Sequence, residues 1–239
     1  MPTYAPANSD EDRHSTLQKI VKTSGEAIVE ASLLPAATRA KIVTFLTTYT
    51  PVIHVLSDKM ADRAQEVSEK DKAQALLETY VRDFYIVLKR RATRLQQNVA
   101  VLVHYGLPQS GDVPAVRSAS DVVDAATKIV NGETAAVAAG FGPMSNPTAA
   151  EVAAVLASFV KESGEVVPAD SAVREAEKAA ADLRPMADEL IDDAKSDLSH
   201  ALRKESGPAQ RRVLRLFGFK FTPNPGETPE SDPTPTPIP

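Results

Sequence analysis

The sequence has no cysteine among its 239 residues, and this absence excludes several kinds of site. Disulfides, thiolate nucleophiles, zinc fingers and iron–sulfur clusters all need cysteine sulfur. Tryptophan is absent as well, and aromatic residues make up only 5% of the chain. The hydrophobic 43% is largely alanine, valine and leucine. Small aliphatic side chains of this kind suit closely packed helices.

Long apolar runs are also missing. No stretch approaches the roughly 18 uninterrupted apolar residues that a membrane-spanning helix requires. The segment Met1–Asp12 lacks the basic start and the apolar run of a secretory signal. The net charge of -5 gives no overall attraction to nucleic acid or anionic lipid. We therefore expect a cytoplasmic protein without a membrane span.

Apolar residues recur at helical spacing in the first part of the chain. The capping and acidic residues before position 13 predict a first helix over 11–32. Pro35 suits the first turn of a second helix, which Pro51 should kink. The segment 69–104 contains neither proline nor glycine and predicts one long helix.

The second part of the chain repeats this helical pattern. Asn131 and Gly132 are able to stop or interrupt the first of its helices, and Pro185 should kink a long one. The last helix is short, basic and amphipathic. The helices are expected over 120–130, 147–163, 168–205 and 209–217.

The fold class predicted from these patterns is all-α, an antiparallel helical bundle with kinked long helices. A Pro/Gly/Ser/Asp segment separates two helical units, and the end of the chain alternates proline with polar residues, a composition that cannot bury apolar surface. The predicted parts are a flexible N-terminus 1–10, a first helical unit 11–106, a linker 107–117, a second helical unit 118–221 and a disordered Pro/Thr-rich tail 222–239.

The two helical units share landmarks at a separation of 112 positions. An aromatic residue followed by glycine ends the last helix of each unit, at Tyr105-Gly106 and at Phe217-Gly218. Such a repeat predicts two similar helical halves produced by an internal duplication. Further pairs at this separation are Pro35 and Pro147, Val43 and Val155, Val55 and Val167, Asp58 and Asp170, and Arg91 and Arg203.

One group of side chains offers ligands for a metal ion. Asp193, Asp197 and His200 fall at i, i+4 and i+7, which places them on one face of a helix. Their oxygen and nitrogen atoms suit a divalent ion. The alternative, which we favour, is a solvated acidic face beside Lys195 and Arg203. No cofactor loop and no activated serine motif accompanies them.

The residues before the tail are candidates for binding. Basic side chains at Arg211, Arg212 and Arg215 could contact phosphates or an acidic partner, although cations near a helix end also complement the helix dipole. Phe217, Phe219 and Phe221 alternate with Gly218 and Lys220, which predicts an extended segment with one apolar edge. This edge either folds back onto the bundle as a plug or docks into another chain.

These features predict a non-enzymatic helical-bundle protein that acts as a structural, scaffolding or protein-binding module. Its partner is another protein or a second copy of itself. Two alternatives stay open. One is a nucleic-acid or polyanion-associated protein that uses the basic clusters at helix ends, and the other is a metal-dependent enzyme. No cofactor is expected for the favoured function.

Overall fold

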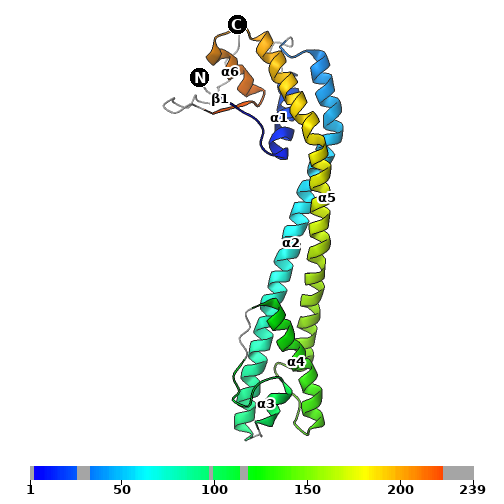
Figure 1. Cartoon of the computed structure of the whole chain (residues 1–239), viewed down its shortest axis with the longest axis vertical. Coiled ribbons are helices and arrows are strands. Elements are labelled where there is room, and N and C mark those ends of the chain that lie inside the picture. Colours follow the sequence, from blue (N-terminus) through cyan, green and yellow to red (C-terminus); the bar gives the residue numbers. More distant parts are fainter. Residues whose placement is uncertain (1–2, 26–32, 97–98, 114–117, 223–239) are drawn as a thin grey trace. The chain divides into compact units, whose positions relative to one another are not determined.

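The computed structural model describes residues 3–25, 33–96, 99–113 and 118–222, and most of them are helical (Figure 1). This confirms the predicted all-α fold class. The helices are α1 (Asp10–Thr23), α2 (Ala36–Arg94), α3 (Ala100–His104), α4 (Ala119–Ala138), α5 (Ala149–Ala201) and α6 (Gly207–Leu216). No described helix combines the length and the apolar character that crossing a membrane requires.

Two short strands are present among the described residues, and the second overlaps the segment around Phe219 and Phe221 that was predicted to be extended. β1 (Thr3–Ala5) pairs antiparallel with β2 (Lys220–Thr222), and Tyr4 lies opposite Phe221. The expected flexible N-terminus 1–10 thus contains a paired strand, because Tyr4 packs its ring against aromatic rings near the other end of the described chain. The predicted tail 222–239 begins inside β2 and otherwise lies outside the described residues.

The described residues form two compact units. Unit 1 combines the residues up to Met60 with those from Val173 onward, and unit 2 is the continuous segment Ala61–Ala172. The division therefore falls inside α2 and α5 and not in the linker predicted over 107–117. The physical reason is that each long helix contributes apolar residues to both cores. Helical periodicity alone does not reveal which core a turn of helix joins.

The two long helices continue across their prolines. α2 contains Pro51, and α5 contains both Pro168 and Pro185. The prediction of separate helices over 147–163 and 168–205 was wrong for this reason. A proline removes one backbone hydrogen bond, and at Pro51 and Pro185 the packing of buried residues in the flanking turns offsets that loss.

Other predicted helix ends also differ from the structure. The helix expected over 11–32 ends at Thr23, and 26–32 lie outside the described residues. The helix expected over 69–104 is instead the second part of α2, followed by the separate short helix α3. α4 continues past Gly132, where a Cβ atom would lie only 2.3 Å from the carbonyl oxygen of His104. Gly132 therefore serves close packing against the end of α3 and does not stop α4.

Unit 1 is built around α1, α6 and segments of the two long helices. α1 lies against the first part of α2 and the last part of α5 (Figure 1), where Arg13 pairs with Asp188. Thr38 of α2 donates to Asp197 of α5. The largest fully buried side chains of this unit are those of Leu17, Ile20, Ile42, Tyr49, Leu198 and Phe217.

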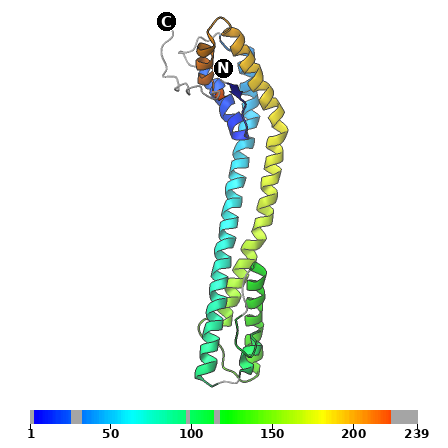
Figure 2. The same cartoon turned by 60° about the vertical axis from the view of Figure 1, so that its left-hand side comes forward.

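Unit 2 is also built from short helices packed on segments of α2 and α5, but it uses the other end of each long helix. Its members are α3, α4, the last part of α2 and the first part of α5, and Figure 2 shows α4 running alongside the two long helices. Tyr85 is buried and donates to the backbone carbonyls of Tyr105 and Ala125. The largest fully buried side chains are those of Leu77, Phe84, Tyr85, Leu88, Tyr105 and Ile129.

The two units end and begin helices in the same way. After α3 and after α6, a glycine in the left-handed region follows the helix, at Gly106 with φ 76° and Gly218 with φ 96°. The amide after each glycine donates to the carbonyl five positions earlier, at 3.1 and 3.2 Å. This is the Schellman type of helix end. The serines before α1 and α4, Ser9 and Ser118, likewise each accept from the amide three residues on.

The separation of equivalent positions is not constant, however. Gly106 and Gly218 are 112 positions apart, whereas Ser9 and Ser118 are 109 apart. The internal duplication therefore stays a prediction, and a single offset does not describe it.

Candidate functional site

One part of unit 2 has helices but no apolar core. We call it the two-helix stretch, and it comprises residues 61–76 of α2 and 160–172 of α5, none of which is buried. The two segments run antiparallel, because Arg63 pairs with Asp170 while Glu66 lies near Glu162. A helix pair without buried side chains depends on polar contacts along its seam.

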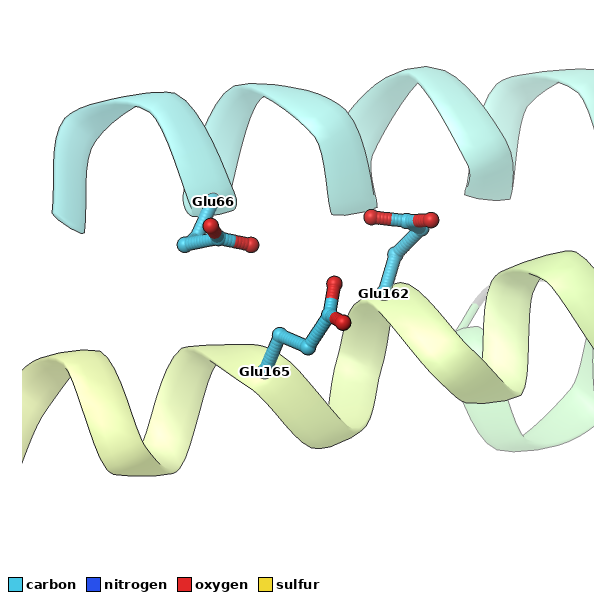
Figure 3. Close-up of side chains that lie close together, drawn as sticks. All are labelled: Glu66, Glu162 and Glu165. Carbon is cyan, nitrogen blue, oxygen red and sulfur yellow. The ribbon is translucent and has the colours of Figure 1, made fainter. Parts of the chain in front are cut away.

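The seam holds a cluster of three carboxylates. Glu66 projects from α2, and Glu162 and Glu165 project from α5, with all three carboxylate groups in the space between the helices (Figure 3). One oxygen of each lies within 4.8 Å of one oxygen of the others. We call these three residues the glutamate cluster.

The charge of the glutamate cluster is only partly compensated. The Lys161 ammonium lies 3.0 Å from Oε1 of Glu162 and 3.4 Å from Oε2 of Glu165. Oε2 of Glu66 and Oε2 of Glu162 are both shielded from solvent and accept no hydrogen bond. The Glu162 side chain is 15% exposed. Unpaired, shielded carboxylate oxygens are unfavourable, so this arrangement costs stability in the isolated chain.

The electrostatics of Glu66 reflect this crowding. Burial, followed by the negative charges of Glu165, Glu69 and Glu162, raises the pKa of Glu66 above its ordinary value. Lys161 opposes this shift by attraction. The Glu66 carboxylate is therefore protonated more easily in the folded chain than in the unfolded chain.

Two kinds of ligand could relieve the repulsion. Three carboxylates on facing helices could offer oxygen ligands to a hard divalent cation such as Ca²⁺ or Mg²⁺, with water completing the shell. A lysine or arginine from another chain could instead make charge-assisted hydrogen bonds to the unpaired oxygens. Within the two-helix stretch, seven acidic side chains accompany four basic ones. The stretch as a whole thus favours a cationic partner.

Exposed apolar residues lie in the same stretch. Val160 and Val167 are 56% and 65% exposed and are seven positions apart on α5, so they share one helix face with Gly164 between them. We call these three residues the α5 stripe. A Cβ atom at Gly164 would have nothing within 4 Å. The backbone there is open to close approach by another helix.

The structure does not assemble the predicted metal ligands. Asp193 is exposed, Asp197 accepts a hydrogen bond from Thr38 at 2.6 Å, and Nε2 of His200 lies 2.7 Å from Arg203. Among the residues that the structure describes, the glutamate cluster is the group of three whose ligand atoms converge. The solvated-face interpretation of Asp193, Asp197 and His200 fits these contacts better than a metal site.

The aromatic candidates near β2 lie in or against the core of unit 1. Phe217 and Phe219 are buried, so neither offers an exposed apolar edge. Phe221 is partly buried and its ring lies 6.2 Å from that of Tyr4. This placement corresponds to the plug interpretation of the segment and not to docking into another chain.

The basic candidates lie on α6. Arg212 is exposed, whereas Arg211 and Arg215 are half-buried. The Arg215 guanidinium lies 5.9 Å from the centre of the Phe221 ring, a cation–π geometry. The structure thus gives Arg215 a role in packing the strand pair, and Arg212 is the most accessible of the three.

Sequence reasoning missed the glutamate cluster. Glu66 lies far from Glu162 and Glu165 along the chain, and carboxylates at i and i+3, as on α5, are common on solvated helices. Only the register between α2 and α5 brings Glu66 to the pair. Comparisons with protein-family models, with curated proteins and with solved structures give no match for this chain.

Proposed function

We propose that this protein is a non-enzymatic helical module that binds another protein through the two-helix stretch. The partner would be an amphipathic helix with small apolar residues on one face and lysine or arginine at its flanks. The observation that supports this most directly is the α5 stripe, which presents two exposed valines and an open glycine backbone in a stretch with seven acidic and four basic side chains. A cytoplasmic location belongs to the same proposal and rests on the cysteine-free composition.

The physical argument is that another helix can pack on the exposed face of α5 that carries the α5 stripe. Recognition of an amphipathic helix uses apolar anchors at i, i+3, i+4 and i+7. Val160, Gly164 and Val167 have the i, i+4, i+7 spacing. Glu162 and Glu165 lie on the opposite face of α5, so cationic flanking side chains would be attracted by the net negative charge of the two-helix stretch, which raises both the association rate and the specificity.

The test uses a synthetic amphipathic peptide with alanine and leucine on one face and lysine at the flanks. Binding to the full chain is followed by fluorescence anisotropy at increasing salt. We expect the peptide to bind and to dissociate as salt is raised, and we expect a matched peptide with glutamate flanks not to bind. Equal binding of both peptides would overturn the proposal.

Substitutions locate the surface. Val160→Asp combined with Val167→Asp should weaken peptide binding at least tenfold, because it places charge on the α5 stripe. Val43→Asp is the matched control, since Val43 is an exposed valine of unit 1, 40% accessible. Loss of binding in both variants, or in neither, would contradict the proposed surface.

Two other outcomes would redirect the proposal. A concentration-dependent mass in light scattering that the Val160→Asp and Val167→Asp substitutions abolish would identify a second copy of the chain as the partner. Salt-dependent binding to duplex DNA, lost when Arg211, Arg212 and Arg215 are replaced by glutamate, would favour the polyanion alternative.

A further inference from the structure

A buried histidine in unit 1 lies at the contact between α1 and α2. His14 of α1 is only 8% exposed. Its Nε2 lies 2.8 Å from Oγ1 of Thr50, and its ring meets the Tyr49 ring edge-on at 5.9 Å between centroids. The ring of His54 lies 6.0 Å away, also edge-on. His14 thus packs as a neutral, mostly apolar side chain whose polar partner, within the described part of the chain, is the Thr50 hydroxyl.

The surroundings do not provide a free anion for a protonated His14. Asp10, one turn earlier on α1, is bonded through both oxygens to the Arg184 guanidinium at 2.7 Å. Asp188 of α5 is likewise bonded to Arg13. His54 of α2 acts electrostatically on His14, and the Tyr49 ring that His14 contacts is surrounded by Asp10 and Arg13 of α1 and by Arg184 and Asp188 of α5.

We propose that His14 is an acid-sensitive latch, which holds α1 against α2 while its imidazole is neutral and releases α1 when the imidazole takes a proton. Protonation would bury a cation beside His54, and the carboxylates of Asp10 and Asp188 are already paired with arginines. α1 is a 14-residue helix of unit 1. Local opening of such an element costs less than unfolding the unit.

The pKa of His14 agrees with its buried position. Burial, and then the charge of His54, lowers the pKa of His14 from its ordinary value of 6.5. The unfolded or detached state therefore binds the proton more readily than the packed state. The stability that neutral His14 contributes is present above pH 6.5 and is lost as the pH falls below it. Asp10 has a lowered pKa, because it is hydrogen-bonded to Arg184, so it stays ionised through this range.

Release of α1 would have a chemical consequence. The helix contacts Tyr49, whose side chain is fully buried, whose ring meets that of His14 and whose hydroxyl donates to the Asp10 carbonyl. Its departure would expose an apolar face of α2 at acid pH only. This inference concerns unit 1 and does not depend on the peptide-binding surface proposed for unit 2.

Hydrogen exchange on the full chain tests the latch. Amide protection of α1 is measured at pH 7.5 and pH 5.0, corrected for intrinsic exchange rates, with α4 as the internal reference. Because the detached state takes up the proton more readily than the packed state, we expect α1 protection to be lower at pH 5.0 than at pH 7.5, while α4 protection does not change. Unchanged α1 protection in the wild-type chain would overturn the proposal.

Two variants separate titration from packing. His14→Phe keeps a ring at the site but cannot take a proton, so its α1 protection should be the same at both pH values. His54→Gln changes an exposed residue and removes the nearby positive charge, so it should reduce the acid-induced loss without risk to folding. The same loss in His14→Phe as in the wild-type chain, or a His14 pKa at or above 6.5 in an NMR titration, would refute the latch.

Discussion

Replacing Gly132 with alanine should destabilise unit 2, because the end of α3 packs directly on this position of α4. A Cβ atom at Gly132 would lie 2.3 Å from the carbonyl oxygen of His104, 2.9 Å from its carbonyl carbon and 3.0 Å from Cα of Tyr105. All three are backbone atoms, so a rotamer change cannot relieve the overlap. α3 would have to move away from α4.

The size of the effect follows from two opposing contributions. Alanine is better than glycine in a helix interior by about 1 kcal/mol. Overpacking in a filled interior costs about 1–3 kcal/mol, and an overlap with backbone places this site at the upper end. The net loss should be about 2 kcal/mol, which for a chain of this size lowers the melting temperature by about 4–8 °C.

Gly164→Ala is the matched control. Gly164 is also inside a helix of unit 2, but nothing lies within 4 Å of the position of its Cβ. Only the propensity term acts there, so this variant should be more stable than the wild-type chain by about 1 kcal/mol. Both variants are measured by urea unfolding followed by circular dichroism at 222 nm. If Gly132→Ala is stabilised as much as Gly164→Ala, the close contact between α3 and α4 does not exist.

Three further predictions follow from the charge and burial of single residues. Glu66→Gln should stabilise the chain at pH 7 and should lose that advantage toward pH 4, because the raised pKa of Glu66 makes the wild-type chain less stable as the pH rises through it. If added Ca²⁺ stabilises the wild-type chain but not this variant, the cluster is instead a cation site. Arg184→Ala should lower the free energy of unfolding by about 1–3 kcal/mol at pH 7, because the Asp10 side chain is 11% exposed and loses a bidentate partner. This difference from the wild-type chain should vanish at a pH below the lowered pKa of Asp10, and an equal difference at pH 2 would contradict the role of the pair. Phe217→Ala should lower the free energy of unfolding in urea by about 3–5 kcal/mol, because its ring is fully buried. Wild-type stability together with weakened partner binding would instead favour docking of this segment into another chain.

The helical fold was predictable from the sequence because its apolar residues recur at helical spacing nearly throughout. The ends of helices were predictable where a cap has a local chemical signature, as at Ser9 and Gly218. Pro168 shows the limit of such rules. It was expected to begin a new helix, yet α5 continues through it, because the helical hydrogen bonds of the turns on both sides outweigh the one that the proline removes.

The candidate site was less predictable, for a different reason. Asp193, Asp197 and His200 share a helix face, but a shared face does not make their ligand atoms converge, and Asp197 bonds to Thr38. Glu66 and Glu162 carry no local signal at all. Their proximity depends on the register between two helices, which the neighbouring pairing of Arg63 with Asp170 helps to set and which no short stretch of sequence encodes.

The discontinuity of unit 1 has a consequence for how the chain folds during its synthesis. Unit 2 is continuous, so all of its core residues are synthesised before Val173. Unit 1 has to wait for Leu214 and Phe217, two buried residues of its core that follow α5 in the chain. At about 5–20 residues per second, roughly ten to thirty seconds pass between the emergence of Met60 and that of these two residues. During that interval the apolar faces of α1 and of the first part of α2 lack some of the core residues that pack against them. Chaperones and proteases therefore have most access to the chain while unit 1 is incomplete.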